Sequence, residues 1–64
     1  MKKRHKIIIK AFRDLGGKAT LGELSEKTGL HVNRLSQSMY SMGQYINLVF
    51  LGGRGKDQKY EIKD

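Results

Sequence analysis

Apolar residues recur at helical spacing in the first quarter of the chain. The spacing i, i+3, i+4 and i+7 places four side chains on one helical face: Ile8, Ala11, Phe12 and Leu15. This pattern predicts a helix over residues 3–15, with basic side chains on the opposite side. The pair Gly16-Gly17 ends the helix. Residues 18–20 then form a short extended link, with room for a one- or two-residue strand.

Two short amphipathic helices follow, joined by a tight turn. Thr20 and Glu23 match the capping box, in which the Thr hydroxyl accepts the N–H of the Glu and the Glu side chain reaches back to the N–H of the Thr. The first of these helices is expected to run to Thr28, with Leu21 and Leu24 on one side. Gly29 supplies the left-handed residue that ends it.

The second of these helices is expected to begin at His31 or Val32 and to end at Gly43. At 100° per residue its buried side carries Leu35, Met39 and Met42. The opposite side is polar and rich in hydrogen-bonding groups: Asn33, Arg34, Ser36, Gln37 and Tyr40. Asn and Gln can pair with adenine and Arg with guanine, so this side suits the reading of DNA bases. An ordinary solvated helix face is the alternative interpretation.

The hydrophobic period changes after Gly43. Residues 45–51 are rich in β-branched and aromatic side chains, and residues 58–62 alternate, so both segments are predicted to be strands. Residues 52–57 between them contain three glycines, which permit the positive φ angles of a hairpin loop with a flexible, basic tip. The order of elements predicts a single α+β domain over residues 1–64.

The net charge of the chain and its distribution indicate a class of partner. The net charge is +7 over 64 residues, and most of the excess lies in residues 1–13, which contain no acid. A polyanion is the natural partner, and nucleic acid is the commonest one. A solubilising tail is the alternative for the basic start alone. We expect residues 1–5 to be flexible, with no special role for His5.

Several classes of protein are excluded or disfavoured. The chain has no cysteine, which excludes disulfides and thiolate metal sites, and no apolar run reaches the roughly 18 residues of a membrane span. The two histidines and six acids show no catalytic or metal-binding spacing, and the glycine-rich loop lacks the P-loop spacing. We expect no enzymatic activity, cofactor, metal ion or small-molecule substrate, and a cytoplasmic, nucleoid-associated location.

From residue 6 to residue 63 the chain resembles the winged helix-turn-helix family. Its most specific stretch is residues 24–30 (LSEKTGL), which is similar to the helix-turn junction of many bacterial and archaeal regulators. The pattern Leu35, Met39, Met42-Gly43 is similar to the buried ladder and stop of the family's recognition helix. Two features depart from the family: the third helix is about one turn shorter than is common, and residues 40–42 replace the usual acidic residues near its end.

The resemblance implies a three-helix fold with a C-terminal β-hairpin wing, in a regulator of transcription that binds double-stranded DNA sequence-specifically. Helix 31–42 would enter the major groove and make base contacts through its five polar outward residues. Contacts to the DNA backbone, or from the wing, are expected from Lys2, Lys3, Arg4, Lys18, His31, Arg54 and Lys56. The N–H groups near His31 favour a phosphate, and Arg54 suits a narrow minor groove.

Two other functions remain open at this point. A winged helix can serve as a protein-interaction module, and the same basic surface can bind structured RNA. The apolar patch for a protein partner would be formed by Tyr40, Met42 and Tyr45. A homodimer on a repeated DNA site is a further expectation, and the candidates for its surface, if the core does not need them, are Ile7, Leu48 and Phe50.

Overall fold

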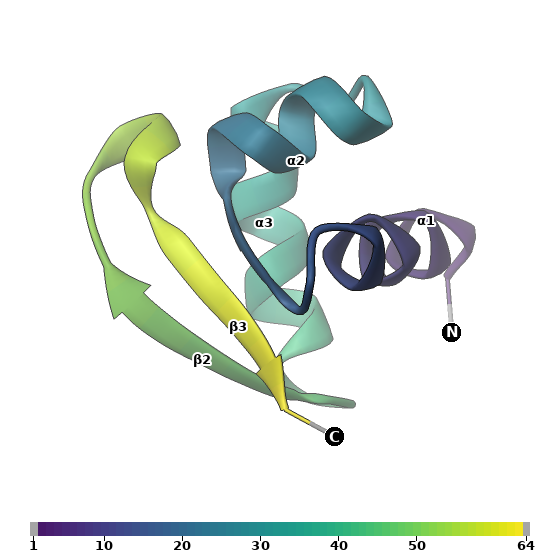
Figure 1. The fold of residues 1–64 in the computed structure, drawn as a ribbon. Coiled ribbons are helices and arrows are strands. Elements are labelled where there is room, and N and C mark those ends of the chain that lie inside the picture. The colour runs from purple at the N-terminus through teal and green to yellow at the C-terminus, as the bar shows by residue number, and fades with distance from the viewer. Residues whose placement is uncertain (1, 64) are drawn as a thin grey trace.

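Three helices and a three-stranded antiparallel sheet make up the computed structural model, which describes residues 2–63 (Figure 1). The elements are α1 (Lys3–Asp14), β1 (Lys18–Thr20), α2 (Leu21–Thr28), α3 (Val32–Met42), β2 (Asn47–Gly52), the 3-10 turn η1 (Gly55–Asp57) and β3 (Lys59–Lys63). The α+β class, the three helices and the two hairpin strands are confirmed.

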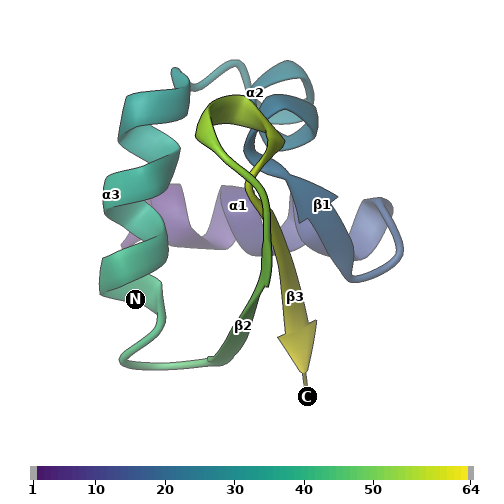
Figure 2. The same cartoon turned by 90° about the vertical axis from the view of Figure 1, so that its left-hand side faces the viewer.

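The link after α1 is a strand that joins the sheet. β1 pairs antiparallel with β3, with Ala19 opposite Tyr60, and β3 pairs on its other side with β2. The resulting order β1-β3-β2 can be followed in Figure 2. A β-bulge interrupts the pairing of β2 between Phe50 and Gly52. The strand covers all three residues of the expected link, rather than one or two, and its pairing ties the link to the C-terminal strand.

One hydrophobic core lies between the helices and the inner face of the sheet. Its buried residues are Ile8, Ala11, Phe12, Ala19, Leu21, Leu24, Leu35, Met39 and Met42. The hairpin contributes partly buried side chains: Leu48, Tyr60 and Ile62. The helical spacing in the sequence therefore identified the buried face of each helix correctly.

Side-chain hydrogen bonds hold the junction between α2 and α3. The capping box is present: the Glu23 N–H donates to Thr20 Oγ1 at 3.1 Å, and the Thr20 N–H donates to Glu23 Oε1 at 2.9 Å. Gly29 ends α2 with φ of 78°. The Ser25 hydroxyl donates to the Leu30 carbonyl at 2.6 Å, so the turn that leads into α3 is tied to α2.

The segment after α3 is a turn, although we expected the strand to begin at Tyr45. The N–H groups of Tyr45 and Ile46 both donate to the Met42 carbonyl, at 2.9 and 3.0 Å. Gly43 does follow the last helical residue, but in a right-handed conformation with φ of −60°. Because the main chain continues to turn here, β2 begins only at Asn47.

α1 begins at Lys3, as the spacing predicted, so residues 3–5 of the start that we expected to be flexible are helical; Met1 lies outside the described residues. His5, to which we gave no role, is buried with 2% of its surface exposed. It lies three residues before Ile8 and therefore extends the same buried helical face. That spacing was the signal in the sequence that could have identified it.

Stability is expected to depend on pH through His5. Its Nδ1 has no hydrogen-bond partner among the described residues, and its ring centroid lies 6.1 Å from that of Tyr45. Burial lowers the pKa of His5 below its ordinary value of 6.5, and the charges of Lys2 and Arg4 lower it further. The unfolded chain therefore binds this proton at higher pH than the folded chain. Stability should be full above about pH 6.5 and should decrease as the pH falls through the folded pKa.

Urea unfolding followed by circular dichroism between about pH 7.5 and pH 5 measures this effect. The control is His5→Leu, in which the decrease should be smaller because the titrating group is gone. The difference between the two profiles separates His5 from His31 and from the carboxylates. Parallel profiles for the two proteins would contradict the prediction.

Candidate nucleic-acid interface

α3 turns its polar side to solvent. The five residues expected to contact bases are all exposed: Asn33, Arg34, Ser36, Gln37 and Tyr40. The opposite side is buried and consists of Leu35, Ser38, Met39 and Met42. Arg34 is the one charged residue on the polar side. This side therefore offers mainly amide and hydroxyl groups to a ligand.

His31 caps the start of α3. Its Nδ1 accepts a hydrogen bond from the Asn33 N–H at 3.1 Å. A neutral ring then carries its proton on Nε2, which can donate to an anion. Of the N–H groups near His31 that we expected to favour a phosphate, that of Asn33 is therefore already occupied by the cap, and Nε2 is a further donor.

The loop between β2 and β3 is a closed turn, although we expected a flexible tip. The Asp57 N–H donates to the Arg54 carbonyl at 2.9 Å across η1. The Lys56 carbonyl lies against Gly22 in the first turn of α2. Gly53 has φ of 102°, and a Cβ there would overlap the backbone of Asp57, so only glycine fits. The turn rests on α2 and leaves the Arg54 and Lys56 side chains exposed.

The expected backbone-contacting cations do not form one patch. Five of them are exposed at two places: Lys2, Lys3 and Arg4 at the start of α1, and Arg54 and Lys56 in the hairpin loop. These places lie on opposite sides of the molecule, with α3 between them (Figure 1). Lys18 Nζ lies 3.9 Å from a Glu61 carboxylate oxygen, so its charge is partly offset. For a ligand that binds α3 and the hairpin loop, the α1 cations are therefore a second group of positive charges, separate from the loop cations.

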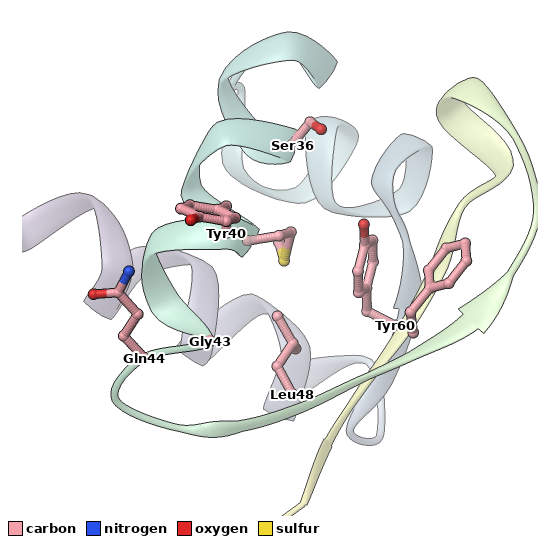
Figure 3. A pocket seen from close by; sticks show the side chains of 8 residues that line it. Ser36, Tyr40, Gly43, Gln44, Leu48 and Tyr60 are labelled. Atoms are coloured by element: carbon pink, nitrogen blue, oxygen red, sulfur yellow. The ribbon is translucent and has the colours of Figure 1, made fainter.

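A groove of about 540 Å³ lies between α3 and the hairpin (Figure 3). It is lined by Ser36, Met39, Tyr40, Gly43 and Gln44 on one side and by Leu48, Phe50 and Tyr60 on the other. The rings of Phe50 and Tyr60 have centroids 5.3 Å apart and are tilted by 51°. The Tyr60 hydroxyl donates to Gln58 Oε1 at 3.1 Å, and burial raises the pKa of Tyr60 above its ordinary value of 10.0.

The groove brings together residues that the sequence analysis kept apart. Ser36 and Tyr40 were expected at a DNA interface, whereas Phe50 and Leu48 were considered only for the core or a dimer. The spacing of residues within one element does not predict which face of a helix lies beside a later strand. The available signal was Phe50, a large apolar residue next to the glycine-rich loop.

Two further findings concern the described residues as a whole. Within residues 2–63, no group of three or more His, Asp or Glu side chains is placed to hold a metal ion. No helix in the same part of the chain has the length and apolar character needed to cross a membrane.

Comparisons with protein-family models, with curated proteins and with solved structures found no match. The class that the fold defines is a small α+β domain with three helices and a three-stranded antiparallel sheet. Its candidate site consists of the polar side of α3, the closed hairpin loop and the groove between them.

Proposed function

We propose that this chain is a winged helix-turn-helix protein that binds double-stranded DNA and regulates transcription. In this assignment α2 and α3 are the helix-turn-helix, α3 enters the major groove, and the hairpin of β2 and β3 is the wing. The observation that carries the proposal is α3 itself, which is polar on its exposed side and anchored by Leu35 and Met39 on the other. A cytoplasmic, nucleoid-associated location is part of the proposal.

The attachment of the hairpin supports its assignment as a wing. β3 joins the hairpin to β1, so the hairpin is held against the helices. The Leu21 N–H donates to the Gln58 carbonyl at 2.9 Å, which ties the end of the loop to the start of α2. Arg54 and Lys56 are thus presented from a fixed support, which suits contacts to phosphates or to a minor groove.

Affinity and specificity are assigned to different residues. The cations at the start of α1 and in the loop contact phosphates whatever the base sequence. Asn33, Arg34 and Gln37 read bases, and each bidentate contact gives about 1–3 kcal/mol of discrimination. One copy of the chain has few such contacts, so tight specific binding calls for two copies on a repeated site.

Selection from random duplex DNA at physiological salt tests the proposal and supplies the binding site. On the selected site, Arg34→Ala and Gln37→Ala should each lower the affinity by about 5- to 150-fold and relax the preference at particular base pairs. Lys10→Ala is the matched control, since it removes a charge from an exposed position on α1. If no sequence is enriched, or if both variants bind the selected site as the unmodified protein does, the proposal is wrong.

A protein-docking role is the second candidate, and the exposed aromatic residues favour it. Tyr40 and Tyr45 are 81% and 63% exposed, within a stretch, residues 35–53, that contains no charged residue. Met42, which we also expected in this patch, is buried in the core and is not part of it. A single protein partner that stays bound after nuclease treatment and in about 0.5 M salt would support docking, because salt screens phosphate contacts. Competition between duplex DNA and duplex RNA at fixed salt tests the RNA-binding alternative.

A further inference from the structure

Two aromatic side chains on facing walls of the groove remain exposed. Tyr40 on α3 is 81% exposed, and Phe50 on β2 is 55% exposed. Both rings therefore present aromatic surface that a ligand in the groove can contact. The neighbouring ring of Tyr60 supports Phe50 at the groove wall.

The groove has no charged side chain in its lining. Ser36 and Gln44 supply hydrogen-bonding groups at its helical wall. A matching ligand is flat and neutral and can form hydrogen bonds. A nucleobase has this chemistry.

We infer that this groove binds one nucleobase that has left the base stack, held against Tyr40 and Phe50. The inference rests on the proposed nucleic-acid binding and adds a preference which that function does not require. A volume of about 540 Å³ lies within the range of about 300–1,000 Å³ of small-ligand sites. Every base has an aromatic face, so the site tolerates any base, and unstacking costs least at a bulge, a mismatch or a single strand.

The test compares three DNA probes at one salt concentration: a matched duplex, the same duplex with one extra unpaired base, and the single strand. The bulged duplex should bind about 5- to 150-fold more tightly than the matched duplex. With 2-aminopurine as the extra base, its fluorescence should fall on binding, because stacking on an aromatic ring quenches it.

Variants of the groove identify where the extra base binds. Phe50→Ala and Tyr40→Ala should each reduce the preference for the bulged duplex towards none. Leu51→Ala is the matched control, since Leu51 is 45% exposed on the same strand and does not line the groove. Phe50→Trp should keep the preference and, in a chain without tryptophan, adds a single tryptophan whose fluorescence the base quenches. Circular dichroism checks that each variant is folded.

The outcomes separate this inference from the proposed function. Equal affinity for the bulged and matched duplexes would overturn the base site and leave duplex binding intact. Absence of binding to all three probes would overturn both. A preference that survives both Phe50→Ala and Tyr40→Ala would also overturn the inference, because the base then binds elsewhere. Similar gains for the bulged duplex and the single strand would support a site for an unstacked base from either source.

Discussion

Replacing Phe12 with alanine is expected to cause a large loss of stability. The Phe12 side chain is fully buried, in a core that contains nine buried hydrophobic residues. Truncation of a buried phenylalanine costs about 3–5 kcal/mol. A domain of 64 residues has about 3–10 kcal/mol of total stability. The substitution therefore removes a third or more of the free energy of unfolding, which urea titration followed by circular dichroism measures.

Ile7→Ala is the control for Phe12→Ala. Ile7 lies on the same helix but is 46% exposed, so its truncation leaves no buried cavity. Its expected effect is about 1 kcal/mol or less. Similar losses of stability in the two variants would mean that the α1 face buried in the core has been assigned wrongly.

The affinity for DNA is expected to fall about 250- to 1,000-fold between about 50 and 200 mM salt. Five or six cations in contact with phosphates release counterions and give a slope of log K against log salt of about −4 to −5. The candidates are the exposed cations at the start of α1 and in the hairpin loop. Fluorescence anisotropy with a labelled duplex over a series of salt concentrations measures the slope. A slope shallower than about −2 would contradict a phosphate-dominated interface.

Replacing single cations with alanine measures how much each residue contributes to this slope. Lys3→Ala and Lys56→Ala should each flatten it by about 0.9 and weaken binding evenly across DNA sequences. Lys18→Ala should change it less, because Glu61 already lies beside the Lys18 ammonium group. If Lys18→Ala has the largest effect, the DNA lies over β1 and not over α3 and the loop.

Much of the secondary structure followed from residues close together in the chain. The spacing of Ile8 and Phe12 predicted the buried face of α1, and the Thr20–Glu23 pair predicted the start of α2. Gly29 predicted its end. These features depend on interactions across one helical turn, so a short window of sequence contains the relevant information.

At His5 and in the hairpin loop, neighbouring residues in the sequence did not predict the contacts that the structure shows. The basic residues around His5 suggested a flexible segment, but its burial follows from packing in the folded chain, where the ring of Tyr45 lies nearby. The three glycines of the loop take the positive φ angles that we expected, but the contact of this turn with α2 near Gly22 was not predicted. In both cases the deciding contact comes from a distant part of the chain.

The amino-acid order alone determined the type and succession of the elements, the buried side of each helix and the polar side of α3. Each of these is set by spacing within a few residues. Folding alone decided that β1 joins β3, that the hairpin loop closes onto α2, and that Tyr40 and Phe50 line one groove. These features join segments separated by intervening elements, so their free energy arises only when the core brings those segments together.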